Sequence, residues 1–225
     1  MPRTARAVEA GTVFHVLNRG NGRQRLFRKD ADFASFEREL AEGLKRYPVD
    51  LLTYCLMGNH WHLELRPRTD DALCRLMGCV VVTQLRRHPE HYRTRGGGHL
   101  YQGRFKRFPV QTEVYFLRLC RYVASNPLRA RLAKRAEDWP WSGLFARRNG
   151  GKALVLSPWP VERPRRWTAA VNDLLGQDEL EALRIRVNRG RPLGEESWVW
   201  STARRLGLEL TLRGPGRPRK IRQNQ

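Results

Sequence analysis

The order of the expected elements predicts an α+β fold built on a ferredoxin-like antiparallel sheet. Strands are expected where apolar and polar residues alternate, and helices where apolar residues recur at helical spacing. The first six elements then run strand, helix, strand, strand, helix, strand, which matches a split βαβ sheet with helices on one face. A seventh element, an added helix, comes next, and a small mainly helical C-terminal extension ends the chain.

The boundaries follow from apolar periodicity and from turn residues. Gly58-Asn59 separates two expected strands and predicts an antiparallel hairpin. Thr112 is the expected N-cap of the added helix, and Asn126-Pro127 is expected to end it. The expected elements are strands at Gly11–Arg19, Val49–Met57, from His60 onward and Phe108–Gln111, and helices at Asp30–Tyr47, from Ala72 to about Arg87 and from Thr112 to about Ser125.

The strand after the hairpin carries a group of polar side chains. His60, His62 and Glu64 share one side, and the apolar residues between them share the other. If the apolar side faces the core, two imidazoles and a carboxylate project together from the opposite face. Two histidines two apart on a strand can hold one divalent metal ion, although an isolated pair more often holds none. Glu64 either orients an imidazole or is a solvated carboxylate, and the second reading is favoured.

The charge of the chain indicates a polyanionic partner. Its 43 Lys and Arg residues against 22 Asp and Glu residues give a formal net charge of +21. Arginine outnumbers lysine, which favours planar recognition of phosphate. A charge of this size implies nucleic acid, but an RNA-binding structural protein would share it. The segment 94–107 interleaves glycines, aromatics and basic residues, so bases could stack there while arginines hold phosphates.

The four cysteines show no paired spacing, so neither a zinc ribbon nor a disulfide framework is indicated. Buried free thiols are expected, which suits a reducing cytoplasm. No apolar run is long enough to span a bilayer, and no membrane partner is expected.

The added helix brings further polar groups to one face. Tyr122 and Asn126 are four residues apart, so they stack one turn above the other, away from the main apolar face. Each alone has a structural explanation, since a helical tyrosine often packs at an edge and Asn before Pro often stops a helix. With the two histidines they form a coherent set of two imidazoles, one amide oxygen and one phenol. The phenol of Tyr122 is a candidate nucleophile, and Tyr115, two turns earlier on the same face, is its rival.

Four segments carry a resemblance to a known family. They are Asn-Arg-Gly-Asn at 18–21, Met-Gly-Asn-His-Trp-His-Leu at 57–63, Gly-His-Leu-Tyr-Gln-Gly-Arg-Phe-Lys at 98–106 and Arg-Tyr-Val-Ala-Ser-Asn-Pro-Leu-Arg-Ala at 121–130. In this order they resemble the single-tyrosine transposases with a His-hydrophobe-His motif, and within these the REP-associated tyrosine transposases. The resemblance covers roughly residues 10–145.

The resemblance implies a metal-dependent endonuclease and strand transferase that acts on single-stranded DNA near hairpins. His60 and His62 would be the metal pair, Asn126 the third ligand and Tyr122 the nucleophile of a 5′-phosphotyrosine intermediate. Many relatives outside the REP-associated branch carry Gln at the position of Asn126. The expected ion is Mg²⁺ or Mn²⁺. The residues expected to contact DNA are Asn18, Arg19, Asn21, Arg23, His99, Tyr101, Gln102, Arg104, Lys106, Arg118, Arg121, Arg217 and Arg219.

The expected organisation is a catalytic domain at 1–145, a connector with a small helical extension at 146–212, and a basic Pro/Gly tail at 213–225. Leu144–Arg166 reads as connector, and helices are expected at Ala169–Leu183 and Glu195–Leu206. The extension is a candidate DNA-binding module, and the protein is expected to act as a monomer or a homodimer. Two alternatives stay open, namely a nucleic-acid-binding protein without chemistry and a rolling-circle initiator or relaxase.

Overall fold

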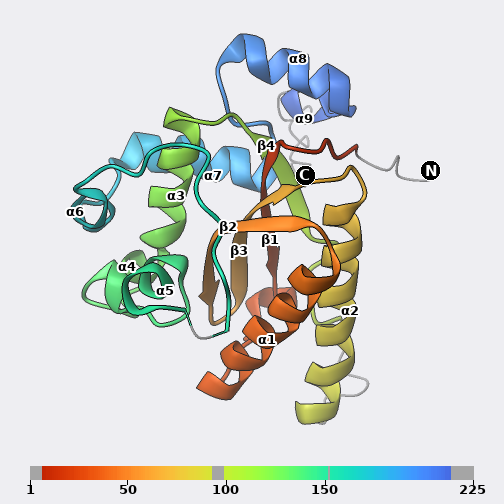
Figure 1. Cartoon of the computed structure of the whole chain (residues 1–225), viewed down its shortest axis with the longest axis vertical. Helices are drawn as coiled ribbons and strands as arrows, with labels where there is room; N and C mark the ends of the chain where they lie inside the picture. Colours follow the sequence, from red (N-terminus) through yellow and green to blue (C-terminus); the bar gives the residue numbers. More distant parts are fainter. Residues whose placement is uncertain (1–6, 93–98, 152, 214–225) are drawn as a thin grey trace, which may run out of the picture.

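The computed structural model describes residues 7–92, 99–151 and 153–213. Within these residues the chain forms an α+β fold, shown in Figure 1. The strands are β1 (Val13–Arg19), β2 (Val49–Met57), β3 (His60–Pro67) and β4 (Lys106–Val110). The α-helices are α1 (Asp30–Arg46), α2 (Ala72–Tyr92), α3 (Val114–Ala124), α4 (Asn126–Arg129), α5 (Gly143–Asn149), α6 (Trp167–Asn172), α7 (Gln177–Arg189), α8 (Glu196–Leu206) and α9 (Glu209–Leu212). Short 3₁₀ turns are η1 (Asn21–Arg23) and η2 (Ala136–Asp138).

The sheet has the predicted topology. In the described part of the chain its four strands lie in the order β2-β3-β1-β4, and neighbouring strands are antiparallel. The predicted hairpin between β2 and β3 is present, with Met57 paired to His60 across the turn. In the β1–β3 register His15 lies opposite Glu64 and Leu17 opposite His62.

Both faces of the sheet are covered, as Figure 1 shows. Helices α1 and α2 lie on one face, where Phe36, Trp61 and Leu76 belong to one buried cluster. Helix α3 lies on the other face, where Phe116 and Leu119 belong to a second cluster with residues from β1 and β2. The added helix therefore covers the strand face that carries the histidines.

Several predicted boundaries are wrong. Thr112 does not cap α3; the N-cap is Glu113, whose φ of 67° is in the left-handed region. The end of the added helix is as predicted, since α3 ends at Ala124 just before Asn126-Pro127. The short helix α4 that follows is unexpected; Pro127 lies in its first turn, where its missing N–H is not needed. The expected connector contains α5, and the helix expected at Ala169–Leu183 is two helices, α6 and α7.

The C-terminal extension packs against the rest of the chain. Leu193 exchanges backbone hydrogen bonds with the β4 edge, donating to Pro109 at 3.0 Å and accepting from Gln111 at 2.7 Å. Leu183 of α7 is buried in the α3 cluster, and Ala203 of α8 is buried in the α1–α2 cluster. The extension therefore contributes to both cores.

Only part of the cysteine prediction holds. The four cysteines are free, but while Cys55 and Cys120 are buried, Cys74 is exposed and Cys79 is half-buried. None of the helices in the described ranges has the length and apolar character that crossing a bilayer requires.

Candidate active site

The two histidines lie on β3 beneath α3. His62 is 2% exposed and Glu64 is fully buried. The favoured reading of Glu64 as a solvated carboxylate is therefore wrong, because α3 packs over this face of the sheet. The polar side of the strand is the floor of a covered site.

Glu64, His15 and His62 form a continuous chain of polar contacts. Nδ1 of His15 lies 2.5 Å from Oε1 of Glu64, and Nε2 of His15 lies 3.0 Å from Nδ1 of His62. His15 is fully buried, as is Glu64. Burial raises the pKa of Glu64, and the charge and hydrogen bond of His15 act against that rise. The chain fixes the orientation of the His62 ring and leaves its Nε2 as the nitrogen that can bind a ligand.

His60 is oriented in the same way by its neighbour. Its Nδ1 lies 2.7 Å from Oδ1 of Asn59, and its ring centroid is 5.0 Å from that of His62. Burial, helped by the charge of Arg19, lowers the pKa of His60 to about 4. Burial also holds the pKa of His62 well below its usual value, and the nearby His60 and His15 add to this effect. Neutral imidazole is the form that binds metal ions.

Tyr122 lies beside this pair. Its ring centroid is 6.1 Å from that of His62, with the two rings nearly perpendicular. The guanidinium of Arg129, from α4, lies over the Tyr122 ring at 4.6 Å from its centroid. Arg129 also donates to the backbone carbonyl of Tyr122 at 2.6 Å and to the Ser125 hydroxyl at 2.5 Å. Burial lowers the pKa of Arg129. The phenol of Tyr122 therefore lies beside the imidazole of His62.

Asn126 is held differently. Its Oδ1 accepts a hydrogen bond from Arg129 at 2.9 Å, and its Nδ2 donates to the Val123 carbonyl at 3.2 Å. The amide oxygen expected to bind metal thus faces a guanidinium in this arrangement. The rival Tyr115 is half-buried, and its ring lies 5.9 Å from the Arg118 guanidinium.

A cavity of about 840 Å³ opens above the histidines and Tyr122. We call it the basic cavity. Its lining residues are Leu17, Asn18, Arg19, Arg23, Asn59, His60, His62, Gln102, Gly103, Arg104, Lys106, Tyr122, Arg184, Val187 and Asn188. Among the described residues that line it, none is acidic. Six of the predicted DNA contacts lie here, namely Asn18, Arg19, Arg23, Gln102, Arg104 and Lys106.

Other predicted DNA contacts lie elsewhere. Tyr101 is 5% exposed, and its hydroxyl lies between Nε1 of Trp61 and the side chain of Gln84. It is a core residue, so the expectation that bases stack on it is wrong. Tyr101 is therefore part of segment 94–107 because it packs in the core.

The remaining predicted contacts do not line the basic cavity. Arg118 pairs with Glu179 at 3.5 Å, and Arg121 pairs with Asp173 at 3.3 Å, so both turn toward the extension. Asn21 and His99 do not line the basic cavity. The backbone carbonyl of Asn21 accepts a hydrogen bond from the backbone N–H of Gln24, and the carbonyl of His99 accepts one from the side-chain amide of Gln24. Arg217 and Arg219 lie outside the described residues.

The donor set limits how a metal ion could be held. The described residues contain no group of three or more His, Cys, Asp or Glu side chains placed to hold a metal ion. His60 and His62 each use Nδ1 for a neighbour, and Nε2 of neither ring has a hydrogen-bond partner among the described residues. Two imidazoles fit a divalent ion whose other positions are filled by amide, phosphate or water oxygens.

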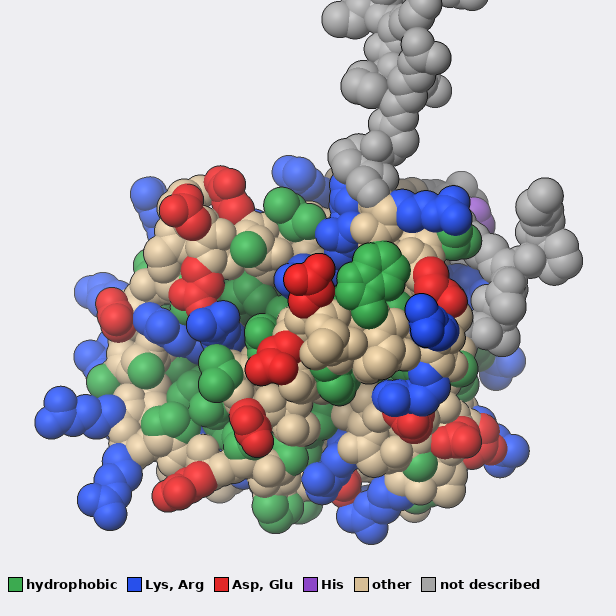
Figure 2. All heavy atoms as spheres, turned by 90° about the horizontal axis from the view of Figure 1, so that it is seen from above, with side chains coloured by type: hydrophobic (Ala, Val, Ile, Leu, Met, Phe, Trp, Pro, Cys, Tyr) green, Lys and Arg blue, Asp and Glu red, His purple; other side chains and the backbone are tan. Residues whose placement is uncertain are grey.

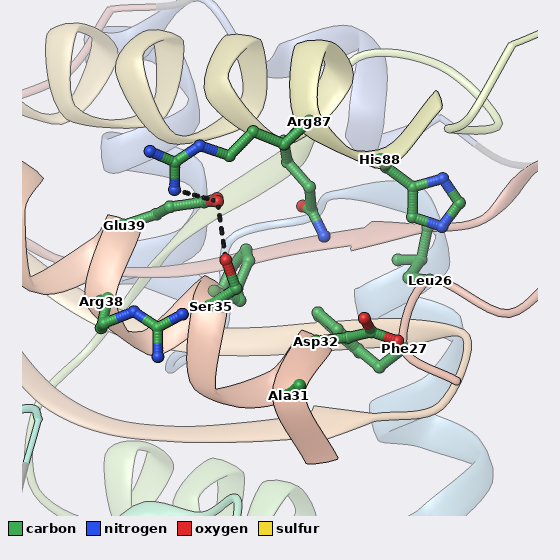
Figure 3. A pocket seen from close by; sticks show the side chains of 11 residues that line it. Leu26, Phe27, Ala31, Asp32, Ser35, Arg38, Glu39, Arg87 and His88 are labelled. Atoms are coloured by element: carbon green, nitrogen blue, oxygen red, sulfur yellow. Dashed lines mark hydrogen bonds and ion pairs between the residues drawn. The ribbon is translucent and has the colours of Figure 1, made fainter. Parts of the chain in front are cut away.

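A second cavity, of about 580 Å³, lies between α1 and α2, on the other side of the sheet from α3. Figure 3 shows Glu39 there, joined to Arg87 and Ser35. Burial raises the pKa of Glu39. None of the predicted catalytic residues lines this cavity. His60, His62 and Tyr122 line the basic cavity instead.

Sequence reasoning missed four residues of the site. His15 lies in a predicted strand, but only the register shows that it joins Glu64 to His62. Arg129 follows the expected end of the added helix, and Arg184 and Asn188 lie in the extension. A polar residue inside an otherwise apolar strand is the one signal that could have identified His15.

Two kinds of comparison match this chain to known proteins. At 18% identity and a TM-score of 0.51, it is similar to a solved structure described as the REP-associated tyrosine transposase bound to a REP hairpin, and the match covers 72% of this chain and 93% of that one. A second structure, from Deinococcus radiodurans R1, matches at 15% identity over 58% of this chain and 92% of that one. Its TM-score of 0.37 is too low for the match to bear on the fold. No curated protein matches. The sequence profile of the IS200-like transposases matches residues 10–126, just over half of the chain. The chain therefore belongs to the IS200-like transposase family.

Proposed function

We propose that this transposase cuts and rejoins single-stranded DNA next to hairpins, with Tyr122 as its nucleophile. The observation that carries the proposal is the meeting of Tyr122 and His62, with ring centroids 6.1 Å apart, at one cavity lined by basic residues. The solved structure similar in fold is described as bound to a REP hairpin, which supports a hairpin substrate here.

The chemistry balances without an external energy source. The phenol oxygen of Tyr122 gives up its proton and bonds to phosphorus, while the bond from phosphorus to the 3′-oxygen breaks. The departing 3′-oxygen takes up a proton and becomes a hydroxyl, and the 5′ end stays joined to the tyrosine. Rejoining is the reverse attack by a 3′-hydroxyl, which releases the phenol. Because the phosphotyrosine bond keeps the energy of the cut bond, ATP is not required.

The residues of the site have separate roles. His60 and His62 would hold Mg²⁺ or Mn²⁺, and imidazole ligands favour Mn²⁺ of the two. Such an ion would polarise the scissile phosphate and stabilise the charge on the departing 3′-oxygen. Arg129 holds Tyr122 from its ring face and from its backbone carbonyl, so it fixes the position of the nucleophile. Asn126 would join the metal ligands only if its oxygen left Arg129.

The test is a covalent adduct. The protein is incubated with labelled hairpin DNA carrying a single-stranded flank and with Mn²⁺, then separated under denaturing conditions. We expect a labelled adduct that EDTA abolishes, that Tyr122→Phe abolishes and that Tyr115→Phe leaves intact. Tyr122→Phe should bind DNA like the wild type, because it keeps the ring and loses only one hydroxyl.

Two outcomes would oppose the proposal. An adduct that persists in Tyr122→Phe assigns the nucleophile elsewhere. DNA binding with no adduct under any condition supports a binding protein without chemistry instead.

A further inference from the structure

Helix α7 of the extension is fixed against the catalytic helix. Leu180, Leu183 and Val187 are buried in the same cluster as Phe116 and Tyr122. These residues are spaced three and four apart, so they form one apolar stripe along α7. The apolar side of α7 is therefore packed against α3.

A neighbouring side of α7 faces the basic cavity. Arg184 and Asn188 both line it, and at a spacing of four they lie one turn apart on the helix. Lys106 of β4 donates from Nζ to the backbone carbonyl of Asn188 at 2.9 Å, which links the end of α7 to the sheet. The cavity thus has one wall from residues within the family match and one wall from residues beyond it.

The charge along α7 is divided. Its first turn carries Asp178 and Glu179, and Glu179 pairs with Arg118 of α3 at 3.5 Å. Arg184 has no acidic partner among the described residues, and its charge acts on Arg129. The face seen in Figure 2, at the α8 end of the molecule, instead mixes acidic and basic side chains. Cations that line a hollow without acidic side chains form a site for an anion.

We propose that Arg184 binds a backbone phosphate of the DNA strand next to the one that Tyr122 attacks, so that α7 positions the strand in the cavity. This inference rests on the proposed function, because it places the same strand in the same site. The ligand is the phosphodiester backbone of single-stranded DNA. Arg184 is a positioning residue, and its guanidinium suits two oxygens of one phosphate.

The experiment compares two arginines of the extension. Arg184→Gln removes the proposed contact, while Arg204→Gln removes the same charge from α8, where Arg204 is exposed and outside the cavity. Binding of a fluorescein-labelled hairpin oligonucleotide with a single-stranded flank is measured by anisotropy over a series of salt concentrations. For Arg184→Gln we expect affinity to fall roughly two- to ten-fold and the slope of log K against log salt to decrease by about 0.7, the value of one single-strand phosphate contact.

Two further variants make the result specific. Arg184→Lys keeps the charge and should restore most of the slope, and Arg204→Gln should keep the slope of the wild type. The unfolding midpoint of each variant checks that the fold is intact. A wild-type slope in Arg184→Gln, or an equal loss in Arg204→Gln, would overturn the inference. The adduct assay separates the two proposals, since wild-type protein that forms no adduct refutes the proposed function while the salt slope still tests Arg184.

Discussion

If His60 and His62 hold a metal ion as proposed, the buried chain from Glu64 through His15 to His62 should set the affinity of that site for the ion. When Nε2 of His62 binds a cation, its proton lies on Nδ1, and one arrangement of the chain then satisfies every partner. Nδ1–H of His62 donates to Nε2 of His15 at 3.0 Å, and Nδ1–H of His15 donates to Glu64 at 2.5 Å. The double variant His15→Phe with Glu64→Met removes both partners and keeps similar shapes.

The magnitude follows from where the His62 proton goes. In the double variant Nδ1 of His62 is buried beside apolar groups, so the proton moves to Nε2, which faces the cavity. Binding a cation must return the proton to a buried nitrogen without a partner, at a cost of about 1–3 kcal/mol. At 1.36 kcal/mol for each factor of ten, this lowers Mn²⁺ affinity about 5- to 150-fold. Loss of an outer partner of a metal ligand typically costs about 10- to 100-fold, which agrees.

Calorimetric titration with Mn²⁺ in the absence of DNA measures this directly. His62→Ala is the control for loss of the ligand itself. Cys120→Ala is the packing control, because Cys120 is buried on α3 in the cluster over the histidines. Nitrogen-15 NMR of the metal-free protein reports which ring nitrogen of His62 carries the proton. A folded double variant with wild-type Mn²⁺ affinity would refute the reasoning.

Two further predictions concern the stability of the fold. Gly143→Ala should lower the free energy of unfolding by about 1–3 kcal/mol in urea titration, because a Cβ there would lie 2.3 Å from Oγ1 of Thr53. Gly78→Ala, at a helical site where a Cβ meets nothing within 4 Å, should raise it by about 0.5–1 kcal/mol, and equal effects of the two would contradict this packing. Burial acts to raise the pKa of Asp50, but hydrogen bonds from two arginines hold it below its usual value. The ionised Asp50 therefore stabilises the fold fully above about pH 4, and this stabilisation is lost as the pH falls through the pKa that Asp50 has in the folded protein. Asp50→Asn should accordingly flatten the dependence of the unfolding free energy on pH in acid.

The local patterns predicted the sheet and the histidine pair well. Alternation over a few residues defines a strand such as Val49–Met57, whose bounds agree with β2. The Gly58-Asn59 turn fixes the hairpin register, and the two-residue period of the strand places His60 and His62 on one face. These features depend on neighbours in the chain, and a sequence displays such neighbours directly.

The surroundings of the site depended on distant contacts and could not be predicted. Glu64 is buried because α3, which begins 50 residues later at Val114, covers its face of the sheet. His15 meets Glu64 across 49 residues through the β1–β3 register. Arg184 reaches the cavity from a helix whose apolar stripe packs on α3. In each case the signal lies in pairing and packing rather than in residue type.

The break between α3 and α4 does more than end a helix, because it brings a side chain of α4 onto Tyr122 of α3. Ser125 has φ −86° and ψ 0°, so the chain turns there before α4 begins at Asn126. The turn brings Arg129 back over the Tyr122 ring and to its backbone carbonyl. A continuous helix would carry a residue seven positions later two turns onward, about 10 Å along the axis. The Ser-Asn-Pro segment thus places a cation on the proposed nucleophile, and the same segment ties up the amide of Asn126.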